Sequence, residues 1–268
     1  MSGFAFSISF PGFYFVRMTP VFLLCLLGFA LVHMFKMIRM YLIVMEKNVP
    51  FKRFLAAYFR TTLVNLIIPY KIGEIYRVAV FSRITGVFNV GLFSVLVDRF
   101  FDTLALLIIL LPYQIFSGRG ISASVAVLTV FLMLLIFAYA CFPSSYKYLN
   151  KYIITSRTSK SSMMVLRVLE LVNECYMYVK ELILGRYGLL MLFSFGAWIV
   201  EILVLMGIAR TIGFGFSASE FGDYISSIMS AGTTRLSLLY TIISAVIIGI
   251  ACIISTCIYL SGKGKENK

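Results

Sequence analysis

Long apolar runs are the feature that most constrains how this chain folds. Five stretches each exceed the roughly 20 residues that a helix needs to cross a bilayer. They are residues 20–45, 87–111, 121–142, 187–212 and 237–260. Helices are the spanning element that such runs favour, because in lipid a helix bonds all its backbone groups internally. The sequence therefore predicts an all-α polytopic membrane protein with about five spanning helices, in one integral membrane domain covering residues 1–268.

The charged residues lie mostly between the apolar runs. The chain has 24 Lys and Arg against 11 Asp and Glu, a net charge of +13. Residues 46–60, 143–186 and the tail, 261–268, are basic, whereas 112–120 and 213–236 are not. The positive-inside rule predicts that the basic segments face the cytoplasm, including the C-terminus, in a multi-pass protein of the cell membrane. Basic residues at membrane edges favour anionic lipid headgroups as partners over nucleic acid.

One stretch, NLIIPYKIGEIYRVAVFSRITG (residues 65–86), interrupts this pattern. The segment before it and the run after it must both start at the cytoplasmic face, so 61–86 has to return to the side it entered from. We expect a re-entrant segment, and not a span, with its structural turn at Pro69 and Gly73. Glu74 and Arg77 are spaced to form an ion pair on the returning half-helix. The alternative is a loop whose charges reach the membrane surface.

Several charged residues lie inside the apolar runs. Asp98 and Asp102 share one helix face, and Arg99 can reach Asp102 at i,i+3. Glu201 lies near the middle of its run, and we expect Arg77 or Arg99 to pair with it. Unpaired charge in hydrocarbon is costly, which makes such residues candidates for a functional site. The alternatives are a structural ion pair locking 87–111 to the re-entrant segment and, for Glu201, a bond to a Ser or Thr of a neighbouring helix.

Three further features complete the predicted architecture. The aromatic-rich residues 1–19 are expected to form an interfacial segment. Residues 162–184 have apolar positions at helical spacing, which predicts an amphipathic helix on the cytoplasmic surface; docking of a partner is the alternative. The single histidine, His33, and the five cysteines show no metal-ligand spacing, so no metal or cofactor is expected.

The stretch 65–86, followed by VDRFFD (97–102), resembles the signature of the flippase-like membrane region of lysylphosphatidylglycerol synthases and its stand-alone relatives. The matching positions are Asn65, Pro69, Lys71, Gly73, Glu74, Arg77, Asp98, Arg99 and Asp102. The resemblance implies a multi-helix membrane protein with re-entrant elements, associated with moving lipids between leaflets or with lipid-linked glycan pathways. Nothing globular follows residue 260, so lysyl transfer is not expected.

These observations predict a flippase-like protein that translocates, or helps to translocate, an anionic phospholipid or a lipid-linked saccharide. Arginine suits phosphate because its planar fork makes paired hydrogen bonds. The expected substrate-binding residues are Asn65, Lys71, Glu74, Arg77, Asp98, Arg99, Asp102 and Glu201. The alternative is a non-transporting scaffold or accessory that binds glycan-assembly proteins. An enzyme acting on a lipid-linked substrate is less favoured, because the sequence has no catalytic motif.

Overall fold

The computed structural model describes residues 15–68, 72–116, 121, 123–156, 160–212 and 235–266. In these ranges the chain is helical and contains no strand. The helices are α1 (Phe15–Val44), the short 3-10 helix η1 (Met45–Lys47), α2 (Phe51–Ile67), α3 (Ile72–Thr85), α4 (Phe88–Phe116), α5 (Ala123–Ser156), α6 (Lys160–Ile183), α7 (Tyr187–Ile212) and α9 (Arg235–Glu266). The predicted fold class, an all-α polytopic membrane protein, is confirmed.

Four of these helices contain segments long and apolar enough to cross a membrane. The segments are Cys25–Val44 in α1, Val125–Thr155 in α5, Tyr187–Ala209 in α7 and Thr241–Ser261 in α9, and they match four of the five predicted spans. The fifth, 87–111, is the 29-residue helix α4. It has the length to cross, but Asp98, Arg99 and Asp102 interrupt its apolar sequence.

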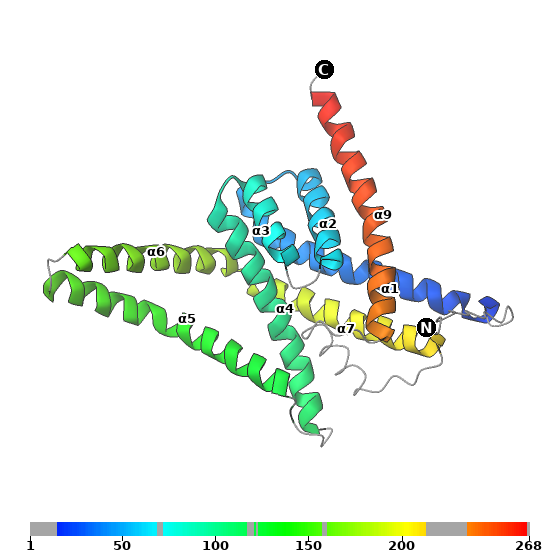
Figure 1. The fold of residues 1–268 in the computed structure, drawn as a ribbon, viewed down its shortest axis with the longest axis horizontal. Helices are drawn as coiled ribbons and strands as arrows, with labels where there is room; N and C mark the ends of the chain where they lie inside the picture. Colours follow the sequence, from blue (N-terminus) through cyan, green and yellow to red (C-terminus); the bar gives the residue numbers. More distant parts are fainter. Residues whose placement is uncertain are drawn as a thin grey trace, which may run out of the picture.

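Helices α1 and α7 lie side by side and run antiparallel (Figure 1). Near the start of α1, Cys25 meets the C-terminal half of α7, where its thiol lies 4.0 Å from the Val204 carbonyl oxygen. At the other end, the Arg186 side chain donates a hydrogen bond to the Leu42 carbonyl, at 2.9 Å. A Cβ added at Gly28 would lie 2.7 Å from a Val204 methyl group. The missing side chain is therefore what lets the two helices approach so closely.

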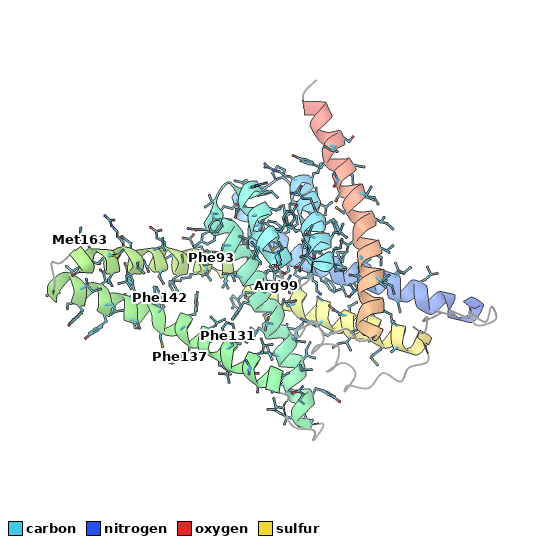
Figure 2. All side chains as sticks on the ribbon, viewed as in Figure 1. Phe93, Arg99, Phe131, Phe137, Phe142 and Met163 are labelled. Atoms are coloured by element: carbon cyan, nitrogen blue, oxygen red, sulfur yellow. The ribbon has the colours of Figure 1, made fainter. Side chains whose placement is uncertain are left out.

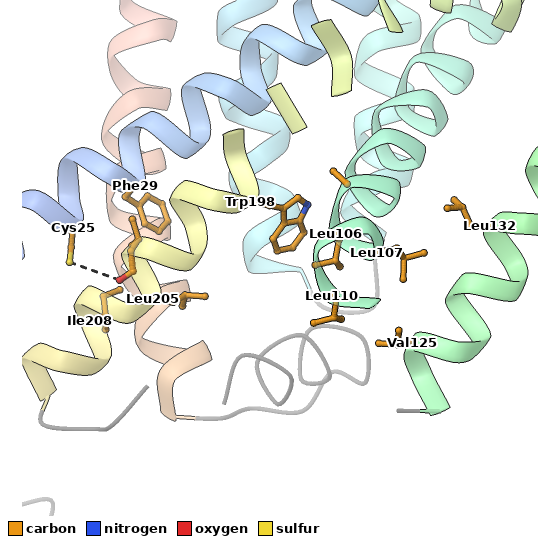
Figure 3. Close-up of a cluster of buried hydrophobic side chains, with 12 residues drawn as sticks. Cys25, Phe29, Leu106, Leu107, Leu110, Val125, Leu132, Trp198, Leu205 and Ile208 are labelled. Atoms are coloured by element: carbon orange, nitrogen blue, oxygen red, sulfur yellow. Dashed lines mark hydrogen bonds between the residues drawn. The ribbon is translucent and has the colours of Figure 1, made fainter. Parts of the chain in front are cut away.

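An apolar cluster joins α1 and α7 to α4 and α5. Phe29, Leu205 and Ile208 pack between α1 and α7, and Trp198 extends the cluster toward α4 (Figure 3). Leu106, Leu107 and Leu110 of α4 then meet Val125 and Leu132 of α5. This cluster occupies one end of the helix bundle. A second cluster, of α1, α2, α3 and α4, occupies the other end and includes Met40, Phe54, Phe81 and Val95.

Helices α2 and α3 form a hairpin that leaves from and returns to the same end of the bundle. At its first open end, the Phe51 and Phe54 rings contact Tyr41, near the C-terminus of α1. At its second open end, the Phe81 ring lies 5.9 Å from the Phe54 ring, measured between centroids. Gly86 then ends α3 with a φ of +77°, a conformation that glycine adopts without a steric penalty. This path is the one expected of a re-entrant segment, whose place in the bilayer stays a prediction.

The hairpin differs in two details from the sequence-based expectation. Its first arm begins at Phe51, ten residues before the expected boundary at 61. Gly73 lies in the first turn of α3 and does not have a positive φ. A Cβ at Gly73 would lie 2.4 Å from the Asn65 Cα atom, so this glycine permits close packing of the two arms. Pro69 lies outside the described residues.

Helices α5 and α6 form a long arm, the α5–α6 arm, that extends away from the other helices (Figure 1). Helix α5 continues through Pro143 to Ser156, 14 residues beyond the predicted end of its span. Helix α6 matches the predicted amphipathic helix, and Tyr176 on its apolar face packs on α5, 4.9 Å from the Tyr139 ring and 5.1 Å from the Phe142 ring. Gly185, with a φ of +75°, forms the turn from α6 into α7.

The chain ends also differ from expectation. Helix α1 already begins at Phe15, inside the segment 1–19 that was expected at the interface, and residues 1–14 lie outside the described part. Helix α9 continues to Glu266, so most of the expected polar tail, 261–268, is helical.

Candidate functional site

Arg39 of α1 is the centre of a polar cluster in the helix bundle. Its Nε donates to Asp98 Oδ1 and its Nη1 to Asp102 Oδ1, both at 2.8 Å, across the interface with α4. The same Nη1 donates to the hydroxyl of Ser194 on α7, also at 2.8 Å. Arg39 and Asp98 are each 1% exposed. Arg39 therefore ties together three helices through short, buried contacts.

The α2–α3 hairpin brings a second group of side chains to the same face of α4. Arg77 lies 3.5 Å from Asp98 and 3.9 Å from Glu74, measured from its Nη1 to the carboxylate oxygens. Arg99 Nη2 lies 2.9 Å from Glu74 Oε1. The Asn65 side-chain amide donates to the same oxygen, at 3.0 Å. These contacts join the tip of the hairpin to the middle of α4.

Lys36 and Glu201 form a third part of the cluster, between α1 and α7. Lys36 Nζ lies 2.7 Å from Glu201 Oε2 and 5.5 Å from the centre of the Trp198 ring. The indole of Trp198 donates to the Asp102 carbonyl, at 3.0 Å, which connects this pair to α4. The expectation that Arg77 or Arg99 pairs with Glu201 is wrong, because α7 packs against α1 and so presents Glu201 to Lys36.

These residues form what we call the polar network, which lies between the two apolar clusters. On α4, Val95 precedes the network and Ala105 follows it. The network contains as many basic as acidic side chains: Lys36, Arg39, Arg77 and Arg99 against Glu74, Asp98, Asp102 and Glu201. Opposite charges offset each other there, so the network is close to neutral.

Most of the predicted site residues come together in this network. Asn65, Glu74 and Arg77 of the hairpin meet Asp98, Arg99 and Asp102 of α4, and the predicted pairs Glu74–Arg77 and Arg99–Asp102 lie at 3.9 and 3.7 Å. Glu201 joins through Lys36 and Trp198. Lys71 lies outside the described residues. The roles of all these residues in binding a substrate stay predictions.

Sequence reasoning missed Lys36, Arg39 and Ser194. The first apolar run, 20–45, was predicted only as a spanning helix, and no partner was assigned to its basic residues. Arg39 lies six residues before the end of that run, about 9 Å along a helix axis. That depth is a signal that Arg39 needs a partner within the protein.

The arginines of the network differ in how firmly they are held. Arg39 makes three contacts of 2.8 Å. The two ion-pair contacts of Arg77 are 3.5 and 3.9 Å long, although Arg77 is only 4% exposed. The Nε atoms of Arg77 and Arg99 are buried and have no hydrogen-bond partner among the residues that the structure describes. Guanidinium groups with free donors are suited to bind an anion with several oxygen acceptors, such as phosphate.

His33 packs beside the network without joining it. Its ring lies 4.9 Å from Phe29, between centroids, and within the described part of the chain neither ring nitrogen has a hydrogen-bond partner. Within the described ranges, no group of three or more His, Cys, Asp and Glu side chains could hold a metal ion.

Comparison with known proteins identifies the family of the chain. The family model for the lysylphosphatidylglycerol synthase TM region matches residues 9–234, which include the whole hairpin and all of α4. No curated protein and no solved structure matches the chain.

Proposed function

We propose that this chain, which belongs to the family of the lysylphosphatidylglycerol synthase TM region, moves lipid between leaflets or assists that movement. The substrate would be an anionic phospholipid or a lipid-linked saccharide, held by its charged headgroup while its apolar chains stay in the bilayer. The C-terminus and the open end of the hairpin would face the cytoplasm, since the segments 46–60 and 143–186 are basic.

One observation carries this proposal: two arginines of the polar network have unused hydrogen-bonding capacity. Arg77 is buried, with long ion-pair contacts, and the side chain of Arg99 is 43% exposed. Both have a free Nε donor. Arg77 also lies over the Tyr58 ring, at 5.6 Å, and this contact leaves its Nε donor unused. A buried donor without a hydrogen bond costs free energy, and a headgroup phosphate would offset that cost. Arg77 and Arg99, which we call the arginine pair, are therefore the proposed headgroup ligands.

The near-neutral network also suits a carrier that must release its cargo. A cluster of arginines alone would hold an anion tightly. The carboxylates of Glu74, Asp98 and Asp102 orient the arginines and reduce the net positive charge. Binding of a headgroup is then favourable enough to occur and weak enough to reverse.

Lipid movement in proteoliposomes tests the proposal. The purified protein is reconstituted with a fluorescent phosphatidylglycerol analogue, and movement between leaflets is followed by chemical quenching from outside. We expect Arg77→Gln and Arg99→Gln to slow the movement about tenfold or more, a loss of roughly 1.4 kcal/mol or more in transition-state stabilisation. Arg167→Gln, at an exposed position on α6, is the matched control and should leave the rate unchanged. Equal rates in all four proteins would contradict the proposal.

A scaffold for surface-glycan or lipid biosynthesis proteins is the second candidate, favoured by the α5–α6 arm. Exposed apolar side chains follow this arm, including Phe131, Phe137 and Met163 (Figure 2). Such a surface can bind lipid or another membrane protein. A scaffold predicts that disrupting α6 abolishes co-purification of a partner, while the arginine variants change nothing.

A further inference from the structure

The carboxylate of Glu74 lies where groups from α2, α3 and α4 converge. Its Oε1 lies 2.9 Å from Arg99 Nη2 and 3.0 Å from the Asn65 amide nitrogen. Its Oε2 is buried, 3.9 Å from Arg77 Nη1, and no described residue forms a hydrogen bond with it. Glu74 also lies in the first turn of α3, where the helix dipole favours negative charge. An anion at this position is stabilised by the two guanidinium groups and by the helix end.

The contacts of Glu74 are incomplete, unlike those at Arg39. Both oxygens of a firmly held carboxylate usually accept short hydrogen bonds, but only one oxygen of Glu74 does. The arginine pair likewise keeps two unbonded Nε atoms. A phosphate offers more oxygen atoms than a carboxylate and could use these remaining donors.

We propose that Glu74 is a displaceable internal anion, which occupies the arginine pair when no substrate is bound and gives way to the anionic headgroup. This inference rests on the proposed function. The headgroup then competes with a side chain of the protein itself. The affinity of the site for the headgroup is therefore lower than the two arginines alone would give. When the headgroup leaves, Glu74 returns to Arg99 and promotes release.

The competing explanation is a structural lock, in which Glu74 fastens the hairpin to α4. The two explanations make opposite predictions. If Glu74 is a lock, its removal loosens the site and weakens headgroup binding. If Glu74 is a competitor, its removal strengthens headgroup binding. Glu74→Gln separates them well, since glutamine has nearly the same size and its side-chain oxygen can still accept the hydrogen bond from Asn65.

Equilibrium binding of short-chain phosphatidylglycerol to the full chain in detergent provides the test, measured by native mass spectrometry. We expect Glu74→Gln to bind the probe about tenfold more tightly than the wild type. Glu74→Asp, which keeps the charge on a shorter side chain that reaches Arg99 less well, should tighten binding to a smaller extent. Glu170→Gln, an exposed carboxylate on α6, makes the same change in net charge and should have no effect.

Failure of this inference can be distinguished from failure of the proposed function. If Arg77→Gln and Arg99→Gln weaken probe binding, but neither Glu74 variant tightens it, the displaceable-anion inference is overturned and the proposed function stands. If the arginine variants bind the probe as the wild type does, the arginine pair is not the headgroup site and both fail.

Discussion

At the scale of single residues, Arg39 and Arg99 differ in both burial and contacts. Arg39 and Asp98 are almost fully buried and in short contact, so neither can lose its partner without leaving a charge in a low-dielectric environment. The side chain of Arg99 is 43% exposed, and screening weakens its ion pairs. Arg39 therefore holds the helices together, whereas the contacts of Arg99 contribute less to stability.

This difference predicts unequal losses of stability. Arg39→Met should lower the free energy of unfolding by about 3–5 kcal/mol, because it leaves Asp98 and Asp102 buried without their main counter-charge. Arg99→Met should cost about 1 kcal/mol or less, since its pairs are partly screened. Unfolding in mixed micelles with increasing SDS measures both values. Equal losses for the two variants would show that Arg39 is not the main structural anchor.

The sequence predicts much of the network and misses its centre, for physical reasons. The spacing of Glu74 and Arg77, or of Arg99 and Asp102, is local, so i,i+3 geometry is enough to pair them. Glu201 and Lys36 are 165 positions apart, and their pairing depends on which helices pack together. One sequence without homologues does not contain that information. Arg39 was missed because basic residues near the end of an apolar run usually reach the membrane surface.

At the scale of elements, close contact between α2 and α3 positions the hairpin side of the network. Gly73 touches the backbone at Asn65, and the amide of Asn65 binds Glu74, the next residue after that glycine. Helix lengths were less predictable: α5 runs on through Pro143. A proline within a predicted helix often ends it, but α5 continues past Pro143, and Tyr176 of α6 packs on it just before that proline, at Phe142.

Gly73→Ala should therefore separate the arms of the hairpin. Its Cβ would lie 2.4 Å from the Asn65 Cα, so the backbones must move apart, at a cost of about 1–3 kcal/mol in unfolding free energy. Phosphatidylglycerol binding should weaken with it, because Arg77, a proposed headgroup ligand, moves with α3. Gly249→Ala in α9, where a Cβ meets nothing within 4 Å, is the control and should slightly stabilise the protein. Similar behaviour of the two variants would contradict this account.

At the scale of the whole molecule, the fold predicts which positions share one side of the membrane. The two open ends of the hairpin lie together at the end of the bundle where α1 stops and α7 begins. Helix α4 starts at that end and runs to the opposite one, where its last residues meet the start of α5. The predicted cytoplasmic face is the first of these ends.

Single cysteines test this arrangement in a background that lacks the five native cysteines. Lys52→Cys and Arg83→Cys, one at each open end of the hairpin, should react with a membrane-impermeant maleimide added from the cytoplasmic side. Ile115→Cys, at the far end of α4, should react only from the opposite side. These three positions are exposed in the structure. Labelling of positions 52 and 83 from opposite sides would show that the hairpin crosses the membrane.

The charges of α4 also bear on how the protein is made. Each Asp or Arg at the centre of a helix adds about 2.5 to 3.5 kcal/mol to the cost of entering a bilayer, and α4 brings three such residues. Arg39, which neutralises two of them, is synthesised earlier, in α1. We therefore expect α4 to insert more readily when α1 precedes it than when it is synthesised alone, which an insertion assay on the two segments would measure. Equal insertion with and without α1 would show that Arg39 does not assist this step.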